Sequence, residues 1–236
     1  MAFEINYILL DIGNSSFDVL YKDKTYKFDR VEDIRKFLAS IDFKRSYVSS
    51  VNSRFFEGIN DLLKEIIDLD SIDKKRRVEE LGYKIPNLPL LASDLLFDIL
   101  GCEKDSLLVD YGTASKFLLI DSNLEYKGGI IGPGLKMMNA SLAGTDLLDN
   151  YEIEVPQNLI NQDTKNAINA SSTYLEAFKI ISLFNYLKKD YPSLKLIITG
   201  GDAKTISEVF TKIGYNNYRV VENVVFKGMK KYFLLD

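Results

Sequence analysis

The sequence predicts an α/β protein of two lobes, each a mixed β-sheet flanked by helices. Three observations lead to this class. Strand-forming runs alternate with amphipathic helical patterns along the chain. A group of three short strands occurs twice, at a separation of roughly a hundred residues, which is typical of an internal duplication. The chain is also long enough to bury two cores, with 236 residues of which 46% are hydrophobic.

The first lobe is expected within residues 1–104. Its strand patterns are separated by the turn sequences GNS and KDK, and apolar residues spaced by three and four mark its helices. The expected strands are 5–10, 16–21, 24–28 and 44–49, and the expected helices are 31–40, 54–67 and 94–101. Segment 70–92 is predicted to be a charged connection followed by an extended stretch, because the two prolines of YKIPNLPLL at 83–91 exclude a helix in that part. The sequence KKRR at 74–77 is interpreted as part of a solvated loop.

The second lobe is expected within residues 105–236. Its first strand, SLLVDYGTA, closes with an acid and a glycine as the first strand of the chain does. Two further strand patterns follow it, SKFLLIDSN and LEYKGGIIG. The remaining expected elements are a strand at 194–199 and helices at 135–148, 164–189, 203–213 and 222–234.

Composition limits the chemistry and the partners. The formal charge of −4 argues against binding nucleic acid or an anionic membrane through bulk electrostatics. No apolar run approaches the ~20 residues of a membrane span, and the first residues lack the pattern of a signal peptide, so a cytoplasmic protein is expected. The absence of histidine excludes Ser-His and Cys-His triads, and the lone Cys102 excludes an internal disulfide. Acid–base chemistry therefore falls to carboxylates, Lys or Tyr.

The most informative motif is the acid and glycine that close the first strand of each lobe. LLDIGNSS at 9–16 and LLVDYGTA at 107–114 share this pattern. A glycine there permits a tight turn whose N–H groups point beyond the strand end, where a phosphate would fit. Asp11 and Asp110 would repel a bare phosphate, so the pattern indicates metal–phosphate binding. Each Asp-x-Gly alone is better explained as an ordinary turn; the repetition in matching three-strand contexts favours the phosphate site.

Two further glycine-rich segments could approach a ligand. KGGIIGPGLK at 127–136 combines four glycines with a proline that suits the first turn of a helix, whose N-terminus favours an anion. ITGGDA at 198–203 ends a strand and opens a helix, and its glycines would let an adenosine lie against the backbone. A bulged hairpin with a capped helix, and a tight strand-to-helix turn, are the structural alternatives.

Taken together, these motifs resemble the acetate and sugar kinase, actin and heat-shock ATPase superfamily, in which two ribonuclease-H-like lobes clamp ATP in the cleft between them. Within it, the chain is similar to type III pantothenate kinases. The matching segments are DIGNSSFDVLY, SSV at 49–51, VDYGTASKFLLID, YKGGIIGPGLKMMNASL, DTKNAI at 163–168 and TGGDA. The resemblance covers nearly the whole chain.

This resemblance implies ATP-dependent phosphorylation of pantothenate to 4′-phosphopantothenate, the first step of coenzyme A biosynthesis, with Mg²⁺ and a monovalent cation (K⁺ or NH₄⁺). It implies a homodimer with pantothenate near the subunit interface. Asp94 would be the general base, and Asp110 would lie near the monovalent cation. The implied ATP contacts are Asp11, Ile12, Gly13, Asn14, Ser15, Ser16, Phe17, Asp18 and Thr113. The implied pantothenate contacts are Tyr83, Ala92, Ser93, Asp94, Leu95 and Thr164.

The sequence departs from the family at its substrate motif. The family pattern is Gly-x-Asp-Arg, whereas ASDL at 92–95 has Ala92 and Leu95 at those positions. The missing arginine removes a fork of donors that could hold a polar substrate. A nucleotide-binding regulatory member with impaired catalysis, or a kinase for another small hydroxyl substrate, therefore remain as alternatives. Structural roles are also open: Asp94 could stabilise a helix N-terminus, Thr164 could cap a helix, and Tyr83 could be a core aromatic.

Overall fold

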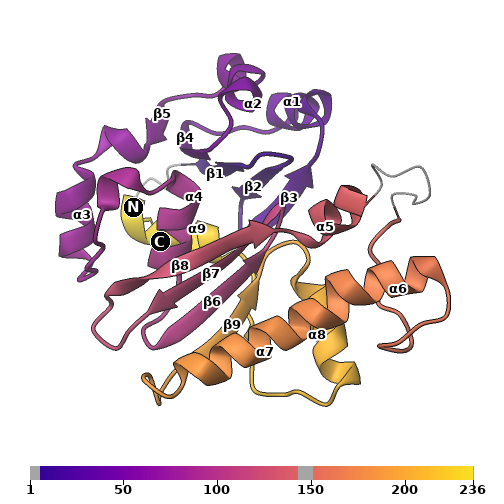
Figure 1. Cartoon of the computed structure of the whole chain (residues 1–236). Coiled ribbons are helices and arrows are strands. Elements are labelled where there is room, and N and C mark those ends of the chain that lie inside the picture. Colours follow the sequence, from indigo (N-terminus) through magenta and orange to yellow (C-terminus); the bar gives the residue numbers. More distant parts are fainter. Residues whose placement is uncertain (1–5, 143–150, 236) are drawn as a thin grey trace. The chain divides into compact units, whose positions relative to one another are not determined.

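The computed structural model describes residues 6–142 and 151–235 (Figure 1). The chain divides into two compact units, which we call the first unit (Met1–Cys102 with Val224–Asp236) and the second unit (Glu103–Asn223). Each unit contains one five-stranded mixed sheet flanked by helices. The predicted fold class is therefore confirmed.

The first unit is organised by a sheet of order β3-β2-β1-β4-β5. β1 pairs antiparallel with β2 and parallel with β4, so the three-strand meander continues into a parallel half. The helix α1 (Val31–Ser40) buries Ile34 and Leu38 against the apolar side chains of β1 and β2. The strands are β1 (Tyr7–Ile12), β2 (Phe17–Tyr21), β3 (Lys24–Phe28), β4 (Arg45–Ser50) and β5 (Ile66–Asp68).

The helix predicted over 54–67 is wrong. Only α2 (Ser53–Glu57) and the short 3₁₀ turn η1 (Asn60–Leu62) are helical, and the end of the segment forms β5. The apolar spacing was helical, but β5 gains backbone hydrogen bonds by pairing in parallel with β4, which a local pattern does not reveal. Glu65, just before β5, has a left-handed φ of 37° that no α-helix can contain.

Segment 70–92 contains a helix that the sequence interpretation missed. The helix α3 (Lys74–Glu80) includes the KKRR sequence, which is therefore not a loop. Its start is defined by Asp73, whose carboxylate accepts a hydrogen bond from the backbone N–H of Arg76 at 3.0 Å. Short 3₁₀ turns, η2 (Leu69–Ser71) and η3 (Leu88–Leu90), flank this helix.

The last helix belongs to the first unit, whereas the sequence division placed it in the second lobe. α9 (Val224–Phe233) packs on α4 (Ser93–Gly101) at very close range. A Cβ on Gly228 would lie 1.9 Å from the carbonyl oxygen of Phe97. Aromatic contacts of Phe97 with Tyr232 and Phe233 complete the interface. Gly101 packs as closely, since its Cβ would lie 2.0 Å from the carbonyl oxygen of Val224. Residues far apart in sequence create this contact, so local patterns could not assign it.

The second unit repeats the topology of the first. Its sheet has the order β10-β9-β6-β7-β8, with β6, β7 and β8 antiparallel and β6, β9 and β10 parallel. The duplication inferred from the sequence is thus present at the level of strand order. The short edge strand β10 was not predicted. The strands are β6 (Ser106–Tyr111), β7 (Ala114–Ile120), β8 (Tyr126–Pro133), β9 (Lys195–Thr199) and β10 (Arg219–Val220).

One long helical segment covers a face of the second sheet. It consists of α6 (Thr164–Ala170), a π-helical turn η4 (Ser171–Leu175) and α7 (Glu176–Leu187), and Figure 1 shows it running beside α8 (Ala203–Lys212). Ile180 and Phe184 bury against Val109 and Ile198 of the sheet. α5 (Leu135–Leu142) starts where predicted, and the rest of the predicted helix 135–148 lies outside the described residues.

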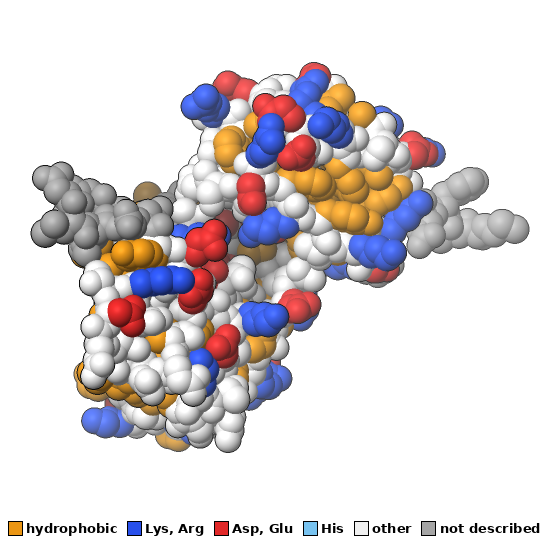
Figure 2. Space-filling view, turned by 90° about the vertical axis from the view of Figure 1, so that its right-hand side faces the viewer, with side chains coloured by type: hydrophobic (Ala, Val, Ile, Leu, Met, Phe, Trp, Pro, Cys, Tyr) orange, Lys and Arg blue, Asp and Glu red, His pale blue; other side chains and the backbone are white. Residues whose placement is uncertain are grey.

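The surface carries both signs of charge. On the face drawn in Figure 2, Lys and Arg side chains are interspersed with Asp and Glu side chains. No described helix combines the length and the apolar character that crossing a bilayer would require.

Candidate functional site

Three polar side chains meet on one face of the first sheet. Asp11, near the end of β1, is aligned with Asp18 of β2 and with Ser49 of β4. Residues aligned across neighbouring strands point to the same face, so two carboxylates and a hydroxyl lie side by side. Asp18 also lies 3.8 Å from the ammonium of Lys27, in a partly exposed ion pair. The face is therefore suited to a hard cation.

The loop that joins β1 and β2 is short and open at its tip. The backbone N–H of Gly13 donates to the carbonyl of Ser16 at 3.0 Å, while the side chains of Asn14 and Ser15 are exposed. Phe17 is fully buried and stacks on Phe55 at 4.7 Å. Ile12 is likewise buried in the core. Of the predicted ATP contacts, Ile12 and Phe17 can therefore offer only backbone atoms, and the tip residues can offer side chains.

The start of α4 is hydrogen-bonded to the end of β4. The hydroxyl of Ser93 donates to the carbonyl of Ser50 at 3.2 Å and lies 3.1 Å from the hydroxyl of Ser49. Because Ser49 is aligned with Asp11, the first turn of α4 and the carboxylates of the hairpin lie at the same end of the sheet. Asp94 stands in this first turn, half-buried, where its carboxylate accepts the backbone N–H of Leu95 at 2.8 Å.

Three of the predicted substrate residues, Ala92, Ser93 and Leu95, adjoin Asp94 at the start of α4, and Tyr83 lies apart from it. Ala92 is exposed and Leu95 is half-buried in the same turn. Tyr83 is buried, and its hydroxyl donates to the carbonyls of Leu100 and Cys102, each at 3.0 Å. This contact lies at the opposite end of α4, about 10 Å along the helix axis from Asp94. Burial raises the pKa of Tyr83 to about 12. The Tyr83 phenol therefore lies in the interior of the first unit, at the other end of α4 from Asp94.

The second hairpin places a cation opposite its acid. Asp110 of β6 is aligned with Lys116 of β7, and the Lys116 Nζ lies 2.7 Å from the Asp110 Oδ2. The two side chains are only 10% and 13% exposed, so this ion pair is largely shielded from water. Thr113, at the tip of the hairpin, is exposed. Sequence reasoning missed Lys116 because the strand register that pairs it with Asp110 has no local signature.

The glycines of the two hairpin tips are not required by their turns. Neither Gly13 nor Gly112 has a left-handed φ, and an added Cβ would meet no atom nearer than 3.5 Å and 3.9 Å, respectively. The sequence interpretation attributed these glycines partly to tight turns, and the backbone gives no such reason. Close packing occurs at Gly134, whose Cβ would lie 2.1 Å from the carbonyl oxygen of Gly112. At Gly200, φ is +92° and a Cβ would lie 2.2 Å from the Asp110 Oδ1.

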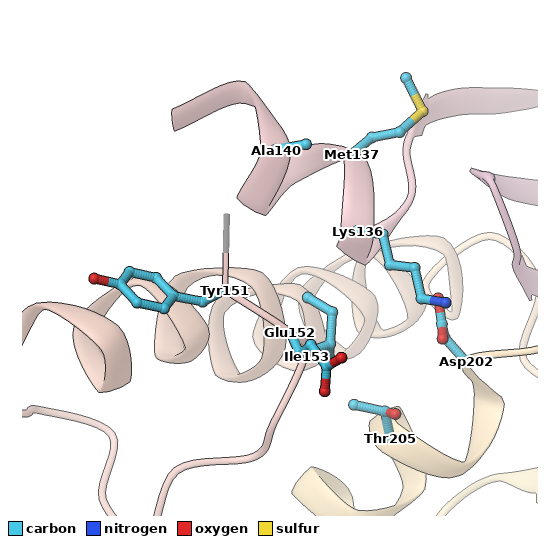
Figure 3. Close-up of a pocket in the computed structure, with 8 residues that line it drawn as sticks. All are labelled: Lys136, Met137, Ala140, Tyr151, Glu152, Ile153, Asp202 and Thr205. Atoms are coloured by element: carbon cyan, nitrogen blue, oxygen red, sulfur yellow. The ribbon is translucent and has the colours of Figure 1, made fainter. Parts of the chain in front are cut away.

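A cavity of about 660 Å³ opens in the second unit between α5, the start of α8 and residues 151–153. Figure 3 shows the Lys136 side chain extending toward Asp202 on one side, with Glu152 and Thr205 below. Both signs of charge and a hydroxyl thus border one space beside the ITGGDA segment. The lining residues are Lys136, Met137, Ala140, Tyr151, Glu152, Ile153, Asp202 and Thr205.

A buried pair of amides supports the wall of this cavity. The Nδ2 of Asn139 on α5 donates to the Oδ1 of Asn169 on α6 at 3.0 Å and to the carbonyl of Tyr151 at 3.1 Å. The Nδ2 of Asn169 donates to the carbonyl of Glu152 at 3.2 Å. These bonds hold the segment 151–152 against two helices. Sequence analysis did not identify either residue, because isolated asparagines carry no signal of burial.

Thr164 has no side-chain hydrogen bond to the Asn139–Asn169 pair among the bonds described above. It is the first residue of α6 and is exposed. The capping residue of the helix is Asp163, which accepts the backbone N–H of Asn166 at 2.9 Å, so the alternative that Thr164 caps the helix is wrong. Within the described residues, no group of three or more acidic, His or Cys side chains is assembled as a metal site.

Known proteins are similar to this chain in sequence and in fold. A protein called type III pantothenate kinase in Bacteroides fragilis is 29% identical over 83% of this chain and 85% of its own length. Another of that description in Borreliella burgdorferi is 26% identical over 95% of both chains. The crystal structure of a Campylobacter jejuni protein, described as a candidate Baf family transcriptional activator, superposes with a TM-score of 0.62 at 25% identity. It covers 96% of this chain and 97% of its own.

The sequence model of one family, described as type III pantothenate kinase, matches residues 7–184. This range begins at β1 and includes both acid-and-glycine hairpins, the first turn of α4 and the Asn139–Asn169 pair. The match covers more than half of the chain, and the chain therefore belongs to the type III pantothenate kinase family.

Proposed function

We propose that this protein transfers the γ-phosphoryl group of ATP to the primary hydroxyl of pantothenate, giving 4′-phosphopantothenate for coenzyme A biosynthesis. The observation that carries the proposal is the family match over residues 7–184, which includes every polar residue grouped around the first hairpin. The two alternatives left open by Leu95, a regulatory member and a kinase for another substrate, gain no support from the relatives. Their names describe pantothenate kinases.

Asp94 is the proposed general base. Its place in the first turn of α4, at the end of the sheet that carries Asp11 and Ser49, supports this role. The hydrogen bond from the backbone N–H of Leu95 orients the carboxylate, which in this role would accept the proton of the substrate hydroxyl. Phosphoryl transfer depends mainly on positioning and charge stabilisation, so a chain without histidine can perform it.

The first hairpin is proposed to hold the phosphates of ATP together with Mg²⁺. Asp11 and Asp18 would be the protein ligands, and the exposed tip at Asn14 and Ser15 would donate hydrogen bonds to phosphate oxygens. Their oxygen donors fit Mg²⁺, which proteins commonly hold through one or two carboxylates plus substrate phosphates. When bound, Mg²⁺ neutralises charge that develops on the transferred group. Thr113 at the tip of the second hairpin is a further proposed ATP contact.

Within the second unit, the cavity beside ITGGDA is a candidate site for a nucleoside. Asp202 and Glu152 can accept hydrogen bonds from sugar hydroxyls, and the apolar carbons of Met137 and Ile153 can contact a base. For pantothenate, Ser93 and Asp94 are the best-supported contacts. Tyr83, Ala92, Leu95 and Thr164 remain predictions.

The family resemblance also implies a monovalent cation at Asp110 and a homodimer. Asp110 is already paired with the ammonium of Lys116, so we assign no step to such a cation. For the dimer, the edge strand β8 offers the exposed side chains of Ile130 and Ile131 as apolar surface. Sedimentation velocity of the purified protein measures the oligomeric state directly.

The function is tested by comparing the wild-type protein with Asp94→Asn in ATP-dependent phosphorylation of pantothenate. We expect the wild type to turn over and the variant to lose about 100-fold or more in kcat. A matched control is Asp33→Asn, which makes the same change in the first turn of α1. If Asp94 serves only the helix dipole, both variants lose about 0.3–1 kcal/mol of unfolding free energy and neither loses turnover. A wild type that binds ATP without phosphorylating pantothenate would refute the proposed substrate.

A further inference from the structure

The charge that a monovalent cation would supply at Asp110 is already present in the chain. The ammonium of Lys116 lies 2.7 Å from the Asp110 Oδ2, and both side chains are close to fully buried. A carboxylate in such surroundings requires a positive partner. Lys116 meets this requirement with the same single charge that K⁺ or NH₄⁺ carries, and its ammonium is a compact donor of three hydrogen bonds.

The surroundings of Asp110 also leave little space for a second cation. Its other oxygen, Oδ1, lies against the backbone at Gly200, where a Cβ would approach to 2.2 Å. The neighbouring strand β9 places Thr199 in register with Asp110, and Gly200 follows it with a left-handed φ. An ion that reached this carboxylate would be close to the Lys116 ammonium and would be repelled by it.

We propose that the Lys116 side chain takes the place of the monovalent cation beside Asp110, so that this kinase works without K⁺ or NH₄⁺. The inference rests on the proposed function. It adds a charge-supplying residue, fixed in the second hairpin by the β6–β7 register, to the residues proposed for ATP binding.

The first test varies the salt around the wild-type protein. Pantothenate phosphorylation and MgATP affinity are measured in KCl, NH₄Cl and tetramethylammonium chloride at one ionic strength. We expect the rate and the dissociation constant to differ by less than about two-fold among the salts, since no cation site needs filling. A rate of phosphorylation that is about tenfold or more higher in KCl than in tetramethylammonium chloride would overturn the proposal.

The second test removes the ammonium. Lys116→Thr shortens the side chain to a hydroxyl, and we expect its MgATP affinity in tetramethylammonium chloride to fall about tenfold and to recover in KCl. The thermal unfolding midpoint of this variant should rise with KCl, whereas that of the wild type should not. Lys127→Thr is the matched control, because Lys127 on β8 forms a more exposed ion pair with Glu125 at 3.0 Å. It should show no K⁺ response.

The outcomes separate the two proposals. If no salt gives phosphorylation of pantothenate, the proposed function fails, and the MgATP titrations still decide whether Lys116 replaces the cation. If Lys116→Thr does not fold, the wild-type salt series decides alone. Lys116→Thr that folds, loses affinity and shows no recovery in K⁺ or NH₄⁺ would mean that the ammonium acts only as a structural ion pair, and this result would also overturn the proposal.

Discussion

The two hairpins of the duplication have the same topology and opposite electrostatics. In the first, the carboxylate of Asp11 faces the carboxylate of Asp18 across the strand pair. In the second, the carboxylate of Asp110 faces the ammonium of Lys116. The acid of the first hairpin thus lies beside a second carboxylate, and the acid of the second hairpin lies beside an ammonium. The two copies of the motif therefore differ in the charge of the residue that is aligned with the acid.

The difference follows from loop length. Residues 13–16 connect the aligned pair Ile12 and Phe17, whereas residues 112–114 connect the aligned pair Tyr111 and Ser115. The second loop is one residue shorter, so the residue that faces the acid is found seven positions after Asp11 and six positions after Asp110. A shift of one residue changes which side chain faces the acid. Loop length thus selects the partner of the acid in each hairpin.

The largest expected effect comes from giving the first hairpin the charge of the second. Asp18→Lys places an ammonium opposite Asp11, where we expect Mg²⁺ to bind. Because the ammonium competes for the carboxylate, kcat/KM for ATP should fall about 100-fold and the Mg²⁺ requirement should increase. Steady-state kinetics over a Mg²⁺ titration measure both. Asp18→Asn removes the same carboxylate without adding a cation and should show a smaller loss; equal losses in the two variants would contradict a role for charge.

A second prediction tests whether each hairpin glycine is needed for ATP to approach the backbone or for close packing of the fold. Gly13→Ala and Gly112→Ala have room for a methyl group, so each should retain the wild-type unfolding free energy while weakening ATP binding. Gly134→Ala has no room beside Gly112 and should lose about 1–3 kcal/mol of unfolding free energy. Urea denaturation and ATP titration of the three variants check this. A destabilised Gly13→Ala with normal ATP affinity would show that the first tip glycine is a packing residue.

The smallest expected effect concerns the residue after each acid, Ile12 in the first hairpin and Tyr111 in the second. The Tyr111 hydroxyl donates to the Glu176 carboxylate at 2.5 Å, and burial, followed by this contact, raises the pKa of Tyr111. The folded protein therefore keeps this proton at a pH where the unfolded chain loses it. The contribution of Tyr111 to the free energy of unfolding is complete below about pH 10, the pKa of the unfolded chain. Above that pH it should fall by up to about 1.4 kcal/mol per pH unit.

Urea unfolding between pH 9 and 11 measures that fall, and Tyr111→Phe should make it shallower. The phenols of Tyr83 and Tyr232, whose pKa values are raised to about 12 by burial, add to the fall in both proteins. An identical pH slope in the wild type and in Tyr111→Phe would show that Tyr111 is not protected from ionisation.

Local patterns predicted the elements whose own residues determine them. The helix Val31–Ser40 and the strand Lys24–Phe28 have the expected bounds, because amphipathic spacing and β-forming side chains act within each segment. Ile66–Asp68 was expected to be helical and forms a strand, since its hydrogen bonds come from β4. The helix Val224–Phe233 was expected, but its packing partner α4 is more than a hundred positions earlier, a separation that no local pattern encodes.

The sequence by itself determined the duplication, the acid-and-glycine hairpins and the family resemblance, because these depend on residue types at short spacings. It also located Asp94 at the start of a helix. Only the tertiary structure decided what faces each acid, which end of α4 holds Tyr83, and how Asn139 and Asn169 support the cavity wall. These features depend on strand register and on contacts between distant segments. Side chains meet there only after the backbone hydrogen bonds of the sheets have aligned them.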